Sequence, residues 1–373
     1  MNDARLSRRQ LLSLGAAAAL SPALRLYPAA SASIAGRAAW LSALCCLPPL
    51  LLYAWLFGRL IGRRRDGEGL AELTLRALGD KAGRAALLLY GLWLLLYAGF
   101  VLRAAAERFT VALFPQSEPA FFVLTLGLAA LAASLCPPRA LARMARMLFP
   151  ALLGVILLLL LVSLRQIEAE NLLPLAGRDA LPALRGALPV AEVLLLGLYA
   201  PGFLLGGLEK RPGAFRALAL WLTGMCLLLA GLCAAVLGCF GAEITARLSL
   251  PFFTLVRNLV FFRTLERMEA LVVALWLFPD FLLASLSLLA AHRCLRLLPG
   301  AAPAGGGEEP TVPAAGRWMI WPGGAAAVTA GLLLAPTGSA LTLWSERIVP
   351  AGQYLAAGLF LIIYMVGTVK KRL

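Results

Sequence analysis

Ten long apolar runs constrain this chain more than any other feature of its sequence. About 20 consecutive apolar residues span a bilayer, and helices or closed barrels are the structures that satisfy the backbone there. Hydrophobic residues make up 61% of the 373 residues and charged residues 14%, more apolar surface than a soluble core of this size needs. Ten spans in a chain this short leave no room for a soluble domain. We therefore predict an all-α integral membrane protein with ten transmembrane helices and a single polytopic domain, residues 1–373. The predicted spans are 10–27, 38–58, 85–106, 119–136, 147–164, 186–207, 217–240, 270–291, 318–336 and 349–369.

The excess of basic residues predicts the orientation of these spans. The net charge is +15, and most Lys and Arg residues fall in the terminal segments and in every second connection, for example at 59–65, 139–146 and 370–372. Because cytoplasmic loops carry the excess of Lys and Arg, we expect a multi-pass cell-membrane protein with both termini in the cytoplasm. The basic residues then contact anionic lipid headgroups, and nucleic acid is not an expected partner.

The ten spans divide into two sets of five. An odd number of spans in each half inverts the second half relative to the first, as in inverted-repeat transporters. The sequence thus predicts a first repeat at about 8–164 and a second repeat at about 186–370.

Spans one and six, which open the two halves, are both interrupted by helix-breaking residues. Span one contains Gly15 and Ser21-Pro22, and span six contains Pro189, Gly197 and Pro201-Gly202. A pair of Gly/Pro-interrupted spans at corresponding positions of two halves points to a substrate site in a membrane carrier. We therefore expect helices one and six to be broken and a binding site to lie at the two breaks.

Two ionisable residues, Glu192 and Asp280, lie well inside spans six and eight. Since a charge at the bilayer centre costs roughly 3 kcal/mol or more, such residues usually face a cavity, a partner or a proton path. We expect both to belong to the site. The alternatives are that the Glu192 carboxyl only stabilises the kink beside it, and that Asp280 only caps or kinks span eight after Pro279.

Span three presents Tyr90 and Tyr97 on one helix face, seven residues apart, and Leu94 and Val101 form a second such pair. These residues either pack against neighbouring helices or form a wall for a small ligand opposite the broken helices. Near the end of the same span, Arg103 and Glu107 have the i, i+4 spacing of a helical ion pair.

No motif in the sequence indicates catalysis, metal binding or a cofactor. The chain has no P-loop, zinc-ligand spacing or nucleophile elbow. Its seven cysteines form no CxxC pair, and His292 is the single histidine. We predict that the protein is not an enzyme and that it has no catalytic residue, no metal and no cofactor.

The N-terminal segment permits a second interpretation. Ser7-Arg8-Arg9-Gln10, the alanine-rich stretch that follows and Ala30-Ser31-Ala32 are similar to a twin-arginine export signal with its cleavage site. Nine further spans are poor cargo for that pathway, so a retained first helix is favoured.

The connections between the spans also contain predicted elements. We predict an amphipathic helix at 69–78, an outer loop at 171–186, an interfacial or re-entrant helix at 248–265 and a flexible linker at 299–313.

Several short motifs occur in the order and spacing of one known family. Leu6-Ser-Arg-Arg-Gln-Leu-Leu12 resembles the "spRQlf" start of the GerAB-type endospore germination permeases, a family within the amino acid–polyamine–organocation (APC) superfamily. Asn171-Leu-Leu-Pro174 is similar to the family's "NLLPv" loop, and the block from Glu266 to Trp276 resembles its "lErlDalfvalW". Leu102-Arg103 and the run from Glu192 to Pro201 are similar to parts of its third and sixth helices.

This resemblance implies a LeuT/APC-like fold, a five-plus-five inverted repeat with broken helices one and six. It also implies a membrane subunit of a germinant receptor in the spore inner membrane, working beside a larger membrane subunit and a lipoprotein. The ligand pocket is then expected among helices one, three, six and eight. Its candidate residues are Gly15, Tyr90, Tyr97, Val101, Glu192, Gly197, Tyr199, Pro201 and Asp280.

The expected function is binding of a small nutrient germinant, an amino acid, which triggers germination. One alternative is a proton-coupled amino acid permease that cycles a proton on Glu192 or Asp280. A second is a structural subunit that binds no ligand and only holds partner proteins in the membrane. The first helix lacks the Gly-Ser-Gly character of active amino acid carriers, and span five contains no lysine. Both departures favour ligand binding over rapid transport.

Overall fold

The structure, a computed structural model, describes residues 6–208, 213–258, 268–298 and 320–370. Over these residues the chain is helical and contains no β-strand, apart from one isolated bridge between Leu6 and Leu208. The first half contains α1 (Arg8–Ala35), η1 (Gly36–Ala38), α2 (Ala39–Cys45), α3 (Leu47–Gly62), α4 (Leu70–Leu78), α5 (Asp80–Ala112), α6 (Pro119–Leu135) and α7 (Pro138–Ser163). The second half contains η2 (Ala169–Asn171), η3 (Gly177–Asp179), α8 (Ala180–Tyr199), η4 (Ala200–Gly207), α9 (Ala214–Arg247), α10 (Pro251–Asn258), α11 (Met268–Arg296), α12 (Ile320–Leu334), α13 (Gly338–Leu343), η6 (Trp344–Ile348) and α14 (Val349–Val369).

Seven helical stretches of the described chain are long and apolar enough to cross a membrane. One of them, Arg8–Gly62, has 55 residues, whereas about 20 suffice for one crossing. It holds two of the predicted spans, and the chain turns between them at Gly36, whose φ of 54° favours glycine. Two shorter apolar helices, α6 and α12, coincide with predicted spans four and nine. The all-helical membrane architecture is thus confirmed, while the ten-helix inverted repeat stays a prediction.

The surface of the bundle is suited to lipid. Large leucines on several helices point outward and are more than half exposed, among them Leu128 on α6, Leu161 on α7, Leu220 on α9, Leu333 on α12 and Leu355 on α14. In water such side chains would form an unusually large apolar surface. In a bilayer they contact acyl chains.

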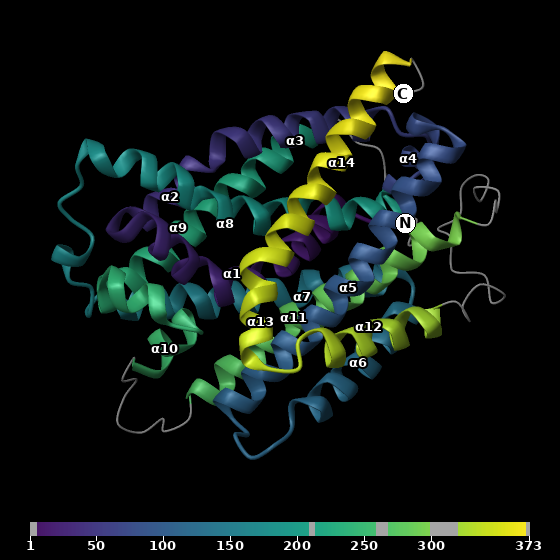
Figure 1. Cartoon of the computed structure of the whole chain (residues 1–373). Coiled ribbons are helices and arrows are strands. Elements are labelled where there is room, and N and C mark those ends of the chain that lie inside the picture. The colour runs from purple at the N-terminus through teal and green to yellow at the C-terminus, as the bar shows by residue number, and fades with distance from the viewer. Residues whose placement is uncertain (1–5, 209–212, 259–267, 299–319, 371–373) are drawn as a thin grey trace.

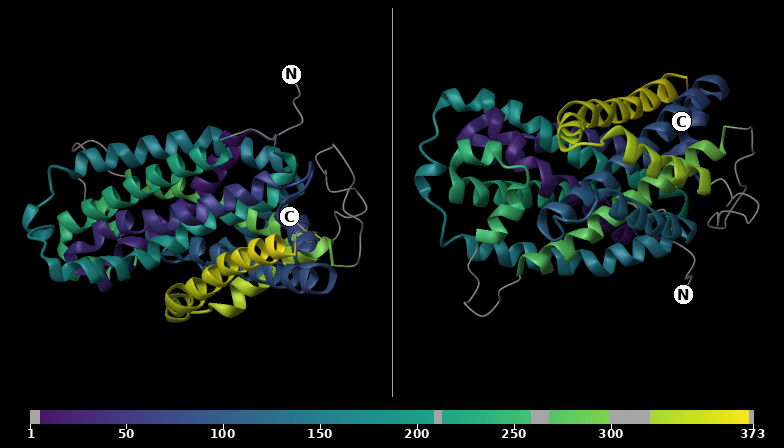
Figure 2. Two further views of the ribbon diagram at one scale, coloured as in Figure 1. Left: turned by 90° about the horizontal axis from the view of Figure 1, so that it is seen from above. Right: turned by 60° about the horizontal axis from the view of Figure 1, so that its bottom comes forward.

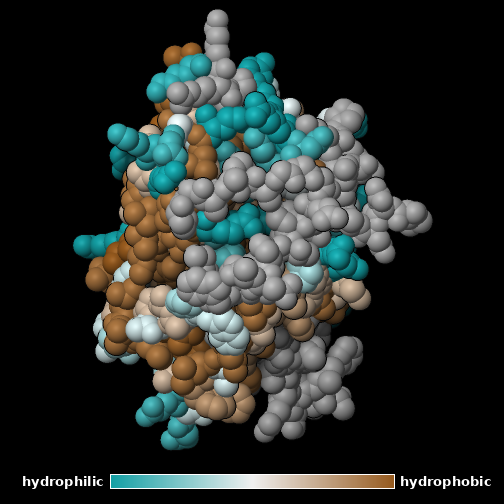
Figure 3. Space-filling view, turned by 90° about the vertical axis from the view of Figure 1, so that its right-hand side faces the viewer, coloured by the Kyte–Doolittle hydropathy of each residue, from teal (hydrophilic) through white to brown (hydrophobic). Residues whose placement is uncertain are grey.

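The first residues of α1 and the last residues of α14 lie at the same end of the bundle, next to α4 (Figures 1 and 2). The guanidinium of Arg63, just after α3, donates to Thr368 near the end of α14 over 3.0 Å, and Leu6 bridges to Leu208 after η4. Further arginines lie at the start of α1, at the end of α3 and just after it, and on α4: Arg8, Arg59, Arg64, Arg65 and Arg76. We call this end of the bundle the basic end; Figure 3 faces it and shows hydrophilic side chains gathered there.

The prediction that helix one is broken is wrong. The helix α1 runs without interruption from Arg8 to Ala35 and contains both Pro22 and Pro28. Each proline removes one N–H from the helical hydrogen-bond pattern, but the alanines before Pro22 have the highest helix propensity of all residues. The helix also packs against α7, α8, α9 and α11, so these neighbours hold its helical path across both prolines.

Helix six does break where the sequence predicts it. The α-helix ends at Tyr199, and the chain continues as the 3₁₀ helix η4 from Ala200 to Gly207. The preceding outer loop is shorter than predicted because α8 begins at Ala180.

The predicted amphipathic helix at 69–78 is observed as α4, whose buried face packs against α5, η4 and α14. The predicted helix at 248–265 is observed as α10 over its first part, and residues 259–265 lie outside the described residues. The linker predicted at 299–313 also lies outside them.

Candidate functional site

The break between α8 and η4 is caused by Pro201. Its ring nitrogen cannot donate to the carbonyl of Gly197, four residues earlier, so that carbonyl has no helical partner. It faces α1 instead, where Gly15 lies so close that a Cβ there would approach the Gly197 oxygen to less than 3.0 Å. A Cβ on Gly197 would likewise lie 2.8 Å from the Gly15 oxygen. The two candidate glycines therefore form the crossing point of helices one and six.

A group of charged and polar side chains meets deeper in the bundle. Arg25 of α1 is 7% exposed and donates from Nη1 to the Ser345 hydroxyl of η6 over 3.1 Å. Its guanidinium also lies 4.7 Å from the ring centroid of Phe100 on α5. Tyr97 of α5 and Glu192 of α8 interact electrostatically with Arg25. We call Arg25, Tyr97, Glu192 and Ser345 the central cluster.

Glu192 differs from the other buried charges in its surroundings. Its side chain is 6% exposed, yet its carboxylate forms neither a hydrogen bond nor a salt bridge with any residue that the structure describes. A buried charge without contact partners is costly. The position therefore favours binding of a proton or of a positively charged ligand group.

The C-terminal helical stretch, which comprises α13, η6 and α14, completes the central cluster. Ser345 lies in η6, a single π-helical turn, and such turns occur frequently at functional sites. One helix further on, Gln353 of α14 is fully buried and accepts a hydrogen bond from the Tyr199 hydroxyl of α8. The amide nitrogen of Gln353 and the indole N–H of Trp93 on α5 have no hydrogen-bond partner among the described residues. These two buried donors next to the cluster can thus donate hydrogen bonds to a ligand oxygen or to a water molecule.

The candidate tyrosines of α5 and α8 are brought together with other aromatic rings. Tyr90 lies 6.4 Å from Tyr199 and 5.4 Å from Phe203, centroid to centroid, and its hydroxyl donates to the Ala356 carbonyl over 2.7 Å. Tyr97 stacks on Phe100 at 6.1 Å. Val101 is buried on the same helix, 4% exposed and one turn beyond Tyr97.

Asp280 is held apart from this cluster by partners of its own. Its carboxylate accepts hydrogen bonds from Arg108 of α5 and from Ser21 of α1. The Arg108 guanidinium also lies 5.1 Å from the ring centroid of Trp276 on α11. These contacts join α1, α5 and α11. Because Asp280 is neutralised within the protein, its geometry fits a structural ion pair better than a ligand contact.

The predicted pair of Arg103 and Glu107 is confirmed. The Arg103 Nη1 lies 2.6 Å from a Glu107 carboxylate oxygen, and its Nε donates to the Ala335 carbonyl after α12 over 2.8 Å. This pair fastens α12 to α5 and lies outside the central cluster.

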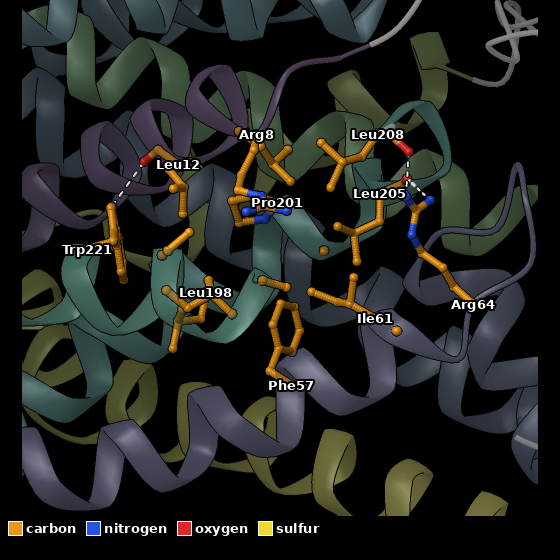
Figure 4. A pocket seen from close by; sticks show the side chains of 17 residues that line it. Arg8, Leu12, Phe57, Ile61, Arg64, Leu198, Pro201, Leu205, Leu208 and Trp221 are labelled. Atoms are coloured by element: carbon orange, nitrogen blue, oxygen red, sulfur yellow. Dashed lines mark hydrogen bonds between the residues drawn. The ribbon is translucent and has the colours of Figure 1, made fainter. Parts of the chain in front are cut away.

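A cavity of about 300 Å³ lies on the other side of the break, between α1, α3, η4 and α9 (Figure 4). Two candidate residues, Gly197 and Pro201, line it, and none of the central cluster does. The lining residues labelled in Figure 4 are Arg8, Leu12, Phe57, Ile61, Arg64, Leu198, Pro201, Leu205, Leu208 and Trp221. The nine candidate residues therefore divide between the cavity, the helix crossing, the central cluster with its aromatic rings, and the Asp280 ion pair.

Sequence reasoning missed Arg25 and Arg108. Arg25 lies near the predicted end of span one at residue 27, but α1 continues to Ala35, which places Arg25 inside the helix. Arg108 follows the predicted end of span three, and α5 continues to Ala112. A search for charges within one helical turn of the predicted span ends would have found both. In the part of the chain that the structure describes, no group of three His, Cys, Asp or Glu residues could hold a metal ion.

Comparisons with known proteins agree with the fold and the motifs. A solved structure of a Na⁺-coupled sialic acid symporter, in a substrate-bound outward-open state, superposes with a TM-score of 0.64. It shares 12% sequence identity with this chain, and the match covers 95% of this chain and 78% of the symporter. This likeness establishes a LeuT-like transporter fold. Among curated proteins, none matches the sequence.

A family model described as "Spore germination protein", the spore permease family, matches residues 5–299. The match includes the segments at Leu6, Leu102, Asn171 and Glu192 that carry the resemblance in the sequence. Since it covers well over half of the 373 residues, this multi-pass membrane protein belongs to the family of spore germination permeases.

Proposed function

We propose that this protein is a membrane subunit of a spore germinant receptor and that it binds a small zwitterionic nutrient, an amino acid, at the central cluster. The observation that carries the proposal is that Arg25 and Glu192, two opposite charges, are both buried in the central cluster and form no salt bridge with each other. The Glu192 carboxylate has no hydrogen-bond or salt-bridge partner among the described residues. An amino acid supplies one charge of each sign in a single small molecule.

The chemistry of the cluster suggests how an amino acid is oriented. Glu192 attracts the α-ammonium group, and Arg25, fixed by Ser345, attracts the α-carboxylate. The buried donors of Trp93 and Gln353 offer further hydrogen bonds. The apolar and aromatic face of α5 around Tyr97 and Val101 then contacts the side chain of the ligand.

Ligand binding can be transmitted through the break beside Glu192. Seven residues separate Glu192 from the end of α8 at Tyr199, where the hydrogen bond to Gln353 connects α8 to α14. A ligand that binds one arrangement of these helices more tightly than another shifts the bundle toward that arrangement, and its differential affinity sets the size of the signal. Germination is the proposed result of that shift.

The wider proposal follows the family resemblance. It comprises a ten-helix domain over residues 1–373 with inverted halves at about 8–164 and 186–370, both termini in the cytoplasm, and a location in the spore inner membrane. A larger membrane subunit and a lipoprotein are the proposed partners. The family membership and the fold support this arrangement.

Germination of spores tests the proposal. Spores that carry Glu192→Gln or Tyr97→Ala should lose the response to the receptor's own nutrient and keep the response to nutrients sensed by other receptors. The exposed Glu170 provides the control substitution Glu170→Gln. Normal germination of both variants in every nutrient would exclude the central cluster as the site.

The alternative functions predict different results with the purified chain. A proton-coupled permease takes up labelled amino acid into proteoliposomes against a gradient, and an uncoupler abolishes the uptake. A structural subunit neither binds nor transports. Saturable binding without concentrative uptake is the result expected of the receptor.

A further inference from the structure

Among the residues that the structure describes, the charged side chains that line the cavity beside the α8–η4 break are all positive. Two of its 17 lining residues are charged, and both are arginines, Arg8 and Arg64; the others are apolar. No Asp or Glu in the described part of the chain lines it. The central cluster, in contrast, contains one charge of each sign, Arg25 and Glu192. The two places therefore suit ligands of different charge, although both adjoin the same broken helix.

Arg64 is fixed in the wall of this cavity, and its Nε has no acceptor among the described residues. Its side chain is 3% exposed, and it donates from Nη1 to the Leu205 carbonyl over 2.6 Å and from Nη2 to the Leu208 carbonyl. Its Nε is buried and has no hydrogen-bond partner among the described residues. Figure 4 shows Arg64 reaching η4 from one side and Arg8 above Pro201. A buried N–H of a cation without an acceptor favours an anionic ligand oxygen.

The size and lining of the cavity narrow the ligand class. About 300 Å³ is at the lower end of the range for small-molecule pockets, and two-chain phospholipids are much larger. Leu12, Phe57, Leu198 and Trp221 supply an apolar interior. The ammonium group of an amino acid would find no counter-ion among the described lining residues, so a zwitterion is disfavoured.

We infer that this cavity is a second ligand site, which binds a single-chain amphipathic carboxylate of the fatty acid class. The chain lies among the apolar residues of α3, η4 and α9, and the carboxylate lies at Arg64 and Arg8. Because Leu198, Pro201 and Leu205 form one wall, an occupant stabilises the η4 conformation seen here. The site is distinct from the proposed amino acid site, since the two share no charged residue.

Trp221 gives a direct measurement of occupancy, since it lines the cavity and donates to the Leu12 carbonyl over 3.1 Å. The full chain is placed in phosphatidylcholine nanodiscs and titrated with 10-bromodecanoate, whose bromine quenches nearby indole fluorescence. Subtracting the same titration of the Trp221→Phe variant isolates the signal of the cavity from quenching of the other tryptophans. We expect a saturable difference signal that decanoate displaces and that decanol and leucine do not.

Two variants test the position and the charge of the site. Ala217→Leu fills the cavity from α9 and should abolish the saturable signal, whereas Ala219→Leu on the same helix, outside the lining, should leave it unchanged. Arg64→Gln should weaken binding about tenfold or more, the effect of losing one charged hydrogen bond.

Three results would overturn the inference: a difference signal that never saturates, equal displacement by decanol, or saturable binding that survives Ala217→Leu. Displacement by leucine would place an amino acid in this cavity and would overturn both this inference and the central cluster as the amino acid site. If Glu192→Gln loses leucine binding and still binds decanoate like the wild-type protein, the two ligands occupy separate sites.

Discussion

Gly15 of α1 and Gly197 of α8 pack backbone against backbone, with no room for a side chain on either. The contact is possible because Pro201 leaves the Gly197 carbonyl without a helical donor, and because glycine has no Cβ to block the approach. Helices one and six therefore meet at the break of helix six, between the central cluster and the cavity.

This close contact predicts that Gly15→Ala destabilises the bundle. The added Cβ would collide with the Gly197 carbonyl, and overpacking of this kind costs about 1–3 kcal/mol. Gly224→Ala on α9 is the matched control, since nothing lies within 4 Å of its Cβ position and alanine is the better helix former. Thermal unfolding of the purified protein should show a lower midpoint for Gly15→Ala alone; equal midpoints would contradict the contact.

The buried pair of Arg108 and Asp280 predicts a strong effect of single substitutions. Either Arg108→Gln or Asp280→Asn leaves a charge in the interior without its partner, which costs about 3–5 kcal/mol. The double variant should be less destabilised than the sum of the two. The exposed pair of Arg84 and Asp80 is the control and should contribute at most about 1 kcal/mol. Additive effects of the two buried substitutions would show that the residues act independently.

Ser345 should affect ligand binding more than stability. Ser345→Ala removes the hydroxyl that accepts from the charged guanidinium of Arg25, and the guanidinium keeps its charge and its ability to donate to a ligand carboxylate. We expect the affinity for the amino acid to fall about two- to tenfold, because the guanidinium is less well positioned. Isothermal titration measures the change, and Ser33→Ala at an exposed position is the control. Unchanged affinity would remove η6 from the site.

Arg64 should control the opening of η4. Its two hydrogen bonds cap the Leu205 and Leu208 carbonyls, and Arg293 of α11 caps the Phe203 carbonyl over 2.6 Å. In Arg64→Gln, hydrogen exchange of amides 200–208 should become faster because local opening costs less free energy. Arg65→Gln, at an exposed neighbouring residue, should leave the exchange unchanged. Equal exchange in the two variants would mean that Arg64 does not hold this segment.

Hydropathy alone was sufficient for much of the fold. Runs of apolar residues predicted helices from α1 to α14, and Pro201-Gly202 predicted the break in helix six. The same rule failed at Pro22, because packing against four neighbouring helices keeps α1 helical. A proline in a membrane helix thus indicates a missing hydrogen bond, and the surrounding helices decide whether the helix breaks.

The site was predicted only in part, for a related reason. Glu192 was visible as a charge inside an apolar run, but Ser345 and Gln353 are neutral and barely change the hydropathy of α14 and its neighbour. Arg25 lies two residues before the predicted end of span one, where the sequence does not distinguish a buried charge from one at the membrane surface. The cavity joins Arg8 to Trp221 across the bundle, and such long-range neighbours follow from the packing of the helices and not from local sequence.

Binding of labelled amino acids to the purified chain in nanodiscs tests the central claim most directly. The panel should contain one amino acid that binds the wild-type protein saturably. Glu192→Gln should weaken that binding about tenfold to hundredfold, the effect of losing a charged hydrogen bond to the ammonium group, and Glu170→Gln should not. Wild-type affinity in Glu192→Gln would contradict the proposed site.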